Sequence, residues 1–243
     1  MSFVTGYLKT LFGIYAALII LLVILVGVPF YFVLFATNVF GNRTPHVAHK
    51  ISIAMAKTLF TFYLIRINVI RKHNLKKDGV YIFVSNHTSL LDVPLCAIVT
   101  PITFRYLSKQ ELVKIPLFGY IIRKLYLSVN RKNEESRALS MEKMKQSLSD
   151  GISIYLFPEG TRNKTNEPLK DFYDGAFRLS IETGIPIVPM TIRNSKKLLD
   201  GYKMKPGTLE CLWSDAIYPA FSDSTESLKA RVRQVMKNDL MLH

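Results

Sequence analysis

The residues between Lys9 and Arg43 carry no charged side chain, and this constrains the fold more than any other feature. The apolar core of this run, Leu11 to Phe40, exceeds the roughly 20 residues that one spanning helix needs. It is also too long for the apolar region of a signal peptide, and no Ala-x-Ala site follows it. Gly27 and Pro29 interrupt it near the middle, which leaves two structures open. One is a single tilted, kinked span. The other, which we favour, is a pair of shorter helices that enter the cytoplasmic leaflet and return.

The charges around this run predict its orientation. A net charge of +14 points to an anionic partner, either nucleic acid, phospholipid headgroups or an acidic substrate. No acidic residue precedes Asp78, and a one-sided basic block beside an apolar run favours a membrane surface. The positive-inside rule then places the remainder of the chain in the cytoplasm. The basic block consists of Arg43, Lys50, Lys57, Arg66, Arg71, Lys72, Lys76 and Lys77.

A second helix is expected directly after the apolar run. Over Ala48–Phe62, apolar residues recur at helical spacing with lysines between them, as in an amphipathic helix at a membrane interface. We therefore divide the chain into a membrane anchor with an interfacial helix, residues 1–62, and a cytoplasmic domain, residues 63–243. The expected apolar side of the interfacial helix is Ile51, Ala54, Met55, Leu59 and Phe62.

Short β-rich runs alternate with helical ones along the cytoplasmic domain, which predicts an α/β fold. The expected strands are 63–71, 79–85, 105–107, 126–129, 152–157, 187–193 and 208–213. One helix is expected to begin near Ser89, and further helices are expected over residues 110–123, 134–148, 173–183 and 225–240. The two cysteines, Cys96 and Cys211, are too few for a disulfide scaffold or a zinc site and are expected to be buried thiols.

The first candidate site follows the strand that ends near Ser85. His87 and Asp92 are five residues apart, so they cannot share one face of a helix. They can meet if His87 lies in a loop and Asp92 in the first turn of the next helix, with Thr88 or Ser89 as its N-cap. Asp92 would then hold one ring nitrogen and leave the other to take a proton. Taken alone, the pair fits a loop histidine that is merely hydrogen-bonded better than it fits a catalytic base.

Two further loops begin where apolar strands stop, and ligands of open α/β sheets bind at such ends. The segment Phe157-Pro158-Glu159-Gly160-Thr161-Arg162 offers a close backbone approach at Gly160. It also offers donors suited to a phosphate at Thr161 and Arg162. Arg131 ends another strand, and Lys109 is a further candidate cation. Taken alone, each of these two fits a solvated surface charge better than a site residue.

In chain order, these segments resemble the motifs of the lysophosphatidic acid acyltransferase (1-acylglycerol-3-phosphate O-acyltransferase) family, bacterial type. Asn86-His87-x4-Asp92 matches its first motif, the strand end at Arg131 its second, and residues 157–162 its third residue for residue. Ile187-Val188-Pro189-Met190 is similar to its fourth, and Lys109-x-Glu111-Leu112-x-x-x-Pro116-x-x-Gly119 is a typical linker. The resemblance covers about residues 63–192. Asn130 departs from the acidic residue that many members carry beside the arginine.

The resemblance implies an α/β fold with a mixed, largely parallel sheet flanked by helices and an N-terminal membrane-embedded helical segment. It implies transfer of an acyl group from acyl-CoA or acyl carrier protein to the sn-2 hydroxyl of lysophosphatidic acid, at the cytoplasmic side of the inner membrane. His87 and Asp92 would be catalytic. Membrane phospholipids are expected partners, and neither nucleic acid nor a metal or organic cofactor is expected. The residues expected to bind and position the acceptor are Lys109, Arg131, Glu159, Gly160, Thr161 and Arg162.

Two alternatives stay open. The acceptor could be glycerol-3-phosphate, another lysophospholipid or a lyso-aminolipid. The chain could also be a catalytically silent scaffold that binds anionic lipid, although such a scaffold would need neither His87 nor Asp92.

Overall fold

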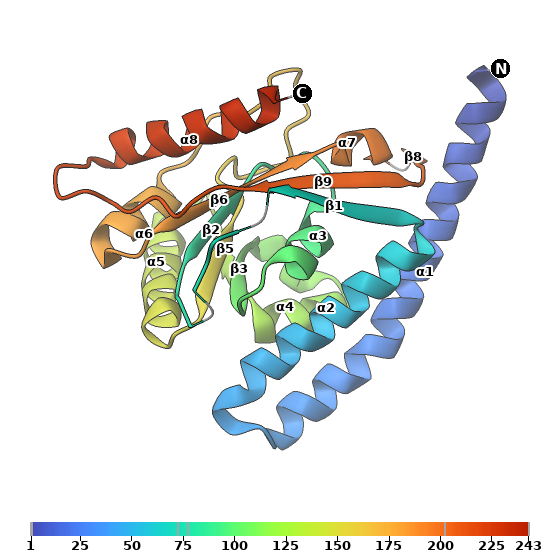
Figure 1. Ribbon diagram of the computed structural model, residues 1–243. Helices are drawn as coiled ribbons and strands as arrows, with labels where there is room; N and C mark the ends of the chain where they lie inside the picture. Colours follow the sequence, from blue (N-terminus) through green and yellow to red (C-terminus); the bar gives the residue numbers. More distant parts are fainter. Residues whose placement is uncertain (1, 72, 77, 202, 243) are drawn as a thin grey trace.

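The uncharged N-terminal run folds as one helix, α1 (Ser2–Thr37), in the computed structural model, which describes residues 2–71, 73–76, 78–201 and 203–242 (Figure 1). The pair of shorter helices that we favoured within this run is therefore wrong, because α1 is continuous through Gly27 and Pro29. An alanine Cβ at position 27 would lie 2.5 Å from Cε of Met55, so Gly27 permits close packing against the next helix. The helix ends at Asn38, which takes a left-handed conformation with φ 45°. Pro29 lies inside α1 without ending it.

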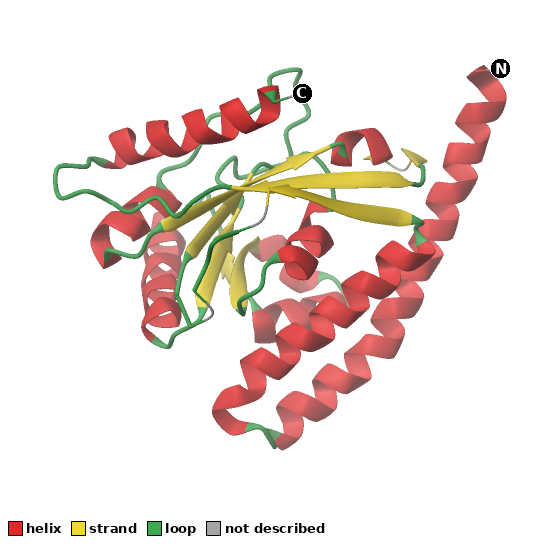
Figure 2. Cartoon of the chain, in the orientation of Figure 1, coloured by secondary structure: helices red, strands yellow, loops and turns green. Residues whose placement is uncertain are grey.

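The chain then returns along α1 as α2 (Thr44–Phe62), so a helical pair does form (Figure 2). Tyrosine hydroxyls connect the two helices: Tyr63 donates to the carbonyl of Ala16 at 2.8 Å, and Tyr15 to that of Phe62 at 3.2 Å. The segment Tyr7–Thr37 is long and apolar enough to cross a membrane. Its large apolar side chains are mostly exposed, which indicates membrane association.

The predicted apolar side of α2 is only partly correct. Ala54 and Phe62 are exposed, as a side that faces the membrane requires, but Leu59 is buried within the protein. The reason is that α2 packs against α1 on one side and α3 on another, so its buried positions do not form a single stripe. The buried residues are Thr44, Ala48, His49, Ala56, Leu59 and Phe60. Lys72 and Lys77 of the basic block lie outside the described residues.

The following domain is built on a seven-stranded sheet of order β1-β9-β6-β2-β5-β3-β4. Every neighbouring pair is parallel except β6 and β9, so the mixed, largely parallel sheet is confirmed. The strands are β1 (Ile65–Arg71), β2 (Ile82–Ser85), β3 (Phe104–Lys109), β4 (Leu127–Val129), β5 (Ser153–Leu156), β6 (Ile187–Arg193) and β9 (Gly207–Trp213).

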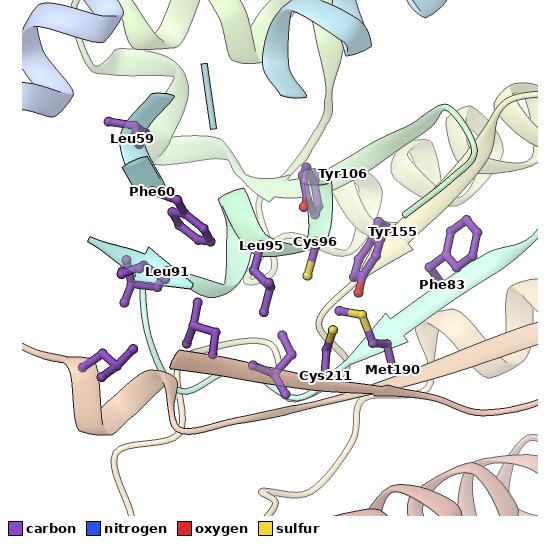
Figure 3. Close-up of a cluster of buried hydrophobic side chains, with 14 of the residues drawn as sticks. Leu59, Phe60, Phe83, Leu91, Leu95, Cys96, Tyr106, Tyr155, Met190 and Cys211 are labelled. Carbon is purple, nitrogen blue, oxygen red and sulfur yellow. The ribbon is translucent and has the colours of Figure 1, made fainter. Parts of the chain in front are cut away.

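Helices cover both faces of this sheet, as the continuous burial of β2 and β5 requires. The face toward α2 carries α3 (Asp92–Val99) and α4 (Phe118–Leu125), and the other carries α5 (Glu134–Ser149), α6 (Gly175–Thr183) and α8 (Thr225–Met241). Figure 3 shows the core on the first face, where Phe83, Tyr106 and Tyr155 pack with Leu95 and Cys96 of α3. Both cysteines are buried thiols, as expected.

The expected helix 110–123 is interrupted, so that prediction is wrong. A 3₁₀ turn (Gln110–Lys114) and α4 replace it, because Pro116 disfavours helical geometry in the residue before it. Leu117 then takes a left-handed conformation with φ 62°. A short helix α7 (Ser195–Leu198) and the two-residue strands β7 (Leu199–Asp200) and β8 (Lys203–Met204) were not predicted.

Candidate active site

The candidate residues gather at the edge where the parallel strands end. β5 and β6 both pair with β2 in parallel register, so the segments after Ser85, Leu156 and Arg193 leave the sheet side by side (Figure 1). β3 and β4 continue this parallel array on the other side of β5. The loops that carry His87, Arg131 and Glu159 therefore lie along one edge of the sheet.

The structure brings His87 and Asp92 together. Nδ1 of His87 lies 2.8 Å from Oδ2 of Asp92, with the histidine in the loop and the aspartate in the first turn of α3, as the spacing required. Asp92 is fully buried, whereas 14% of the His87 side chain is exposed. The pair therefore combines a buried carboxylate with an imidazole ring that is partly accessible to a substrate.

Asp92 also organises the loop around the histidine. Its Oδ2 atom accepts the backbone N–H groups of Thr88 at 2.7 Å and Ser89 at 2.8 Å. The expected N-cap at Thr88 or Ser89 is wrong, since α3 begins at Asp92 and its side chain accepts those amides instead. A loop held by three hydrogen bonds to one oxygen is pre-organised around the imidazole.

Glu159 holds the same loop from the neighbouring strand. Its Oε1 atom accepts the backbone N–H of His87 at 2.8 Å, and its Oε2 atom accepts that of Lys170 at 2.9 Å. Burial raises the pKa of this carboxyl above its ordinary value, and the two N–H donors act in the opposite direction. With 1% of the residue exposed and both oxygens engaged, Glu159 is placed to position His87.

Three contacts at this edge were missed by sequence reasoning. The Asn86 amide bridges β2 to β6, accepting from Ile192 N–H at 2.7 Å and donating to its carbonyl at 2.9 Å. The N–H of Asn163 donates to the carbonyl of His87 at 2.6 Å. The His87 ring stacks on Phe157, with 4.2 Å between ring centroids. In the sequence, these contacts were indicated only by Asn86 beside His87 at the end of β2 and by Phe157 before Pro158 at the end of β5.

Gly160 and Arg131 are also brought together. Gly160 has φ 72°, and an alanine Cβ there would lie 2.5 Å from Tyr173 and 3.3 Å from Nη1 of Arg131. Partial burial lowers the pKa of Arg131 below its ordinary value, while Tyr173 and Glu111 raise it. Lys109 pairs with Glu111 at 3.0 Å, with both side chains more than half exposed. Lys109 thus sits on the outer rim of the same edge.

Arg162 is the candidate cation in the loop after β5. It forms neither a hydrogen bond nor an ion pair with any residue that the structure describes, although it is partly buried. Its neighbour Asn163 contacts the His87 loop, and Thr161 accepts a hydrogen bond from Nζ of Lys170 at 2.9 Å. The guanidinium of Arg131 likewise has neither a hydrogen bond nor an ion pair among the described residues, so Arg162 and Arg131 are both open for an anion.

A histidine held by a buried carboxylate, at a sheet edge that also carries guanidinium groups left open by the described residues, defines an α/β protein whose site is suited to general-base chemistry on an anionic substrate. Residues 66–193 match the family model described as Acyltransferase. The chain belongs to the acyltransferase family, which confirms the resemblance.

Individual relatives agree with this assignment. A chloroplastic 1-acyl-sn-glycerol-3-phosphate acyltransferase of Arabidopsis thaliana is 29% identical over 77% of this chain and 50% of its own length. A 1-acyl-sn-glycerol-3-phosphate acyltransferase of Helicobacter pylori is 28% identical over 66% of this chain and 72% of its own. The match thus spans about half the length of the Arabidopsis relative.

One solved structure is similar over nearly the whole chain. The 1-acyl-sn-glycerophosphate (LPA) acyltransferase PlsC of Thermotoga maritima superposes with a TM-score of 0.79 at 27% identity. The superposition covers 99% of this chain and 96% of that one, so the likeness includes the helical pair α1 and α2 as well as the sheet.

Proposed function

We propose that this chain transfers a fatty acyl group from acyl-CoA or acyl carrier protein to the sn-2 hydroxyl of lysophosphatidic acid, which yields phosphatidic acid. The observation that carries the proposal is the 2.8 Å contact between His87 and a buried Asp92. Two relatives named 1-acyl-sn-glycerol-3-phosphate acyltransferase support it. The similarity of PlsC to this chain over both the sheet and the helical pair supports it as well.

The hydrogen bonds around Asp92 define the state of the imidazole. An ionised carboxylate that already accepts two backbone N–H groups can only accept from a third partner, so Nδ1 of His87 carries the hydrogen of that contact. In the neutral ring, Nε2 is then the unprotonated nitrogen. This tautomer is inferred from the hydrogen-bond network. It is the one that general-base catalysis needs.

In the proposed reaction, Nε2 of His87 takes the proton of the sn-2 hydroxyl as the hydroxyl oxygen attacks the thioester carbonyl. The tetrahedral intermediate collapses with cleavage of the C–S bond, and the imidazolium returns the proton to the leaving thiolate. General-base catalysis of this kind contributes on the order of 10²–10⁴-fold. Asp92 stabilises the imidazolium while it exists. Neither a metal nor an organic cofactor enters any of these steps.

The acceptor phosphate is proposed to bind to Arg162, with Arg131 and Lys109 adding positive charge along the rim. Gly160 keeps the backbone close, and the Thr161 hydroxyl, which accepts from Nζ of Lys170, keeps its own hydrogen to donate. Glu159 acts by holding the His87 loop. Orientation of the two amphiphilic substrates supplies a further part of the rate enhancement.

The exposed apolar surface of α1 would keep both substrate tails in lipid while the headgroups reach the strand ends. With basic residues concentrated after Arg43, we place the sheet domain on the cytoplasmic side of the inner membrane.

One assay tests the proposal. Purified chain in mixed micelles is incubated with lysophosphatidate, glycerol-3-phosphate, lysophosphatidylcholine or a lyso-aminolipid, each with acyl-CoA or acyl carrier protein, and products are identified by mass. Phosphatidic acid should dominate. Preferred acylation of an acceptor without a terminal phosphomonoester would assign a different acceptor, and no product from any pair would favour the lipid-binding scaffold.

A further inference from the structure

A small cavity with several polar side chains in its lining lies at the opposite edge of the sheet from His87. It has a volume of about 30 Å³ and is lined by the first residues of β3, the last turn of α4 and the first half of α2. One water molecule needs ~10–15 Å³ on this measure, so the cavity has room for two or three water-sized groups. Phe35 of α1 and Pro45 of α2 close one side. The cavity therefore adjoins the end of the membrane-associated helical pair.

The polar groups of this cavity are incompletely satisfied. His49 is 8% exposed, its ring packs edge-on against Phe104 at 4.7 Å, and its Nε2 atom has no hydrogen-bond partner among the described residues. An unpaired buried polar atom costs on the order of 1–3 kcal/mol, so such atoms normally mark a bound water or ligand. The hydroxyls of Ser52 and Thr103 also line the cavity and already have partners. Ser52 contacts the hydroxyl of Tyr31 at 2.7 Å, and Thr103 contacts Nδ1 of His46 at 2.8 Å, which leaves the Thr103 hydrogen free when His46 donates.

Positive charge at this cavity is unbalanced. Lys124 lines it, with Nζ lying 5.9 Å from the centroid of the Phe35 ring, and Arg105 is a further lining residue. Neither forms an ion pair within the described part of the chain, and none of the described residues that line the cavity is acidic. An anion with several acceptor oxygens would therefore satisfy groups that the protein leaves open.

We propose that this cavity binds the phosphate group of an anionic phospholipid, with Nε2–H of His49, the Lys124 ammonium and the Thr103 hydroxyl as donors. A lipid is favoured over free phosphate because the turn after α1 carries Asn38, Asn42 and Arg43, polar residues that belong at headgroup level. The site is separate from the sheet edge that carries His87, Arg131 and Glu159, here called the catalytic edge, and does not depend on the proposed reaction.

The test measures the melting temperature of the full chain in nonionic detergent, because a ligand that binds only the folded state raises it. The background carries Arg162→Ala, which removes the proposed phosphate contact at the catalytic edge. Dioleoyl phosphatidate is compared with dioleoylglycerol, which has the same tails without the phosphate, and with inorganic phosphate. We expect phosphatidate to raise the melting temperature by several degrees and dioleoylglycerol to leave it unchanged.

Two variants locate the effect. Lys124→Gln and His49→Phe should each reduce the shift at least twofold, the second retaining an aromatic ring against Phe104. Lys143→Gln, which removes one exposed charge from α5, should retain the full shift. An undiminished shift in Lys124→Gln and His49→Phe, or no shift with any phosphate, would overturn the site. A shift with inorganic phosphate alone would keep the phosphate chemistry and overturn the lipid as its source.

Discussion

The side chain of Glu159 accepts a hydrogen bond from the backbone N–H of His87, with 2.8 Å between Oε1 and the backbone nitrogen. The two residues are 72 positions apart, yet this contact joins the loop after β2 to the loop after β5. Because the second carboxylate oxygen binds the N–H of Lys170, Glu159 connects three segments of the catalytic edge. The position of the candidate base thus depends on a residue that we first assigned to the acceptor.

His87→Ala should lower kcat by about 10²–10⁴-fold, because it removes the proposed base and leaves the loop's backbone contacts in place. Initial rates with lysophosphatidate and a saturating thioester measure this effect. His46→Ala is the control, since His46 lies in α2 and contacts Thr103. Activity of purified His87→Ala within threefold of the parent would exclude this mechanism.

Asp92→Ala should lower both activity and stability, in contrast to His87→Ala. Removing this buried carboxylate leaves the N–H groups of Thr88 and Ser89 without an acceptor, at about 1–3 kcal/mol for each buried donor. Thermal unfolding measured beside kcat distinguishes the two variants. An Asp92→Ala protein as stable as the parent would show that these hydrogen bonds contribute little.

Arg162→Ala should raise the KM for lysophosphatidate about tenfold or more and leave the KM for the thioester nearly unchanged, because a charge-assisted hydrogen bond contributes roughly 1.5–3 kcal/mol. Steady-state kinetics with each substrate varied in turn provides the comparison. Lys164→Ala, an exposed cation in the same loop, is the matched control. Equal increases in both KM values would argue against a phosphate contact at Arg162.

Gly160→Ala should impair acceptor binding more than Gly184→Ala, although both glycines have a positive φ near 70°. The added Cβ at position 160 would collide with Tyr173 and displace Arg131, whereas the one at position 184 meets no atom within 4 Å. Both variants lose stability from backbone strain, on the order of 1 kcal/mol. The KM for lysophosphatidate should therefore rise only in Gly160→Ala, and a rise in both would point to a general effect of strain.

Burial lowers the pKa of His49 to about 4, with a smaller contribution from His46 in the same direction. The unfolded chain therefore binds this proton at a higher pH than the folded one does, and the folded state loses stability as pH falls from about 6.5 toward 4. The loss is at most about 3 kcal/mol. Denaturant titrations of the parent and His49→Phe across this range should show a steeper pH dependence in the parent, and parallel curves would contradict the prediction.

Local patterns predicted most elements of the sheet domain. β6 runs over the expected residues, and α5 ends within one residue of its expected end, because buried β-branched runs and capped amphipathic helices are local signals. The order β1-β9-β6-β2-β5-β3-β4 could not be derived in this way, since pairing depends on contacts between distant segments. The division at residue 62 stays a prediction.

Within the candidate site, the residues were predicted better than their contacts. The spacing of His87 and Asp92 predicted their contact, because two residues five apart can meet only if the first lies in a loop and the second in the first turn of the following helix. The bridge from Asn86 to Ile192 spans 106 residues, and no local pattern encodes it. The chemistry of Glu159 likewise follows from burial, which depends on the assembled sheet and not on its neighbours in the chain.

The hydroxyl contacts of Tyr15 and Tyr63 fasten α1 to the junction of α2 and β1, so the helix and the sheet domain cannot rotate independently. The segment Tyr7–Thr37 has 31 residues, which is about 46 Å of helix against a hydrocarbon core of ~30 Å. Because α2 packs back along α1 and leads directly into β1, α1 would have to lie oblique to the membrane for the sheet domain to stay outside the lipid. The angle of α1 would then set how the strand ends meet the lipid surface, and membranes of thinner or thicker lipids should change turnover without any change in the protein.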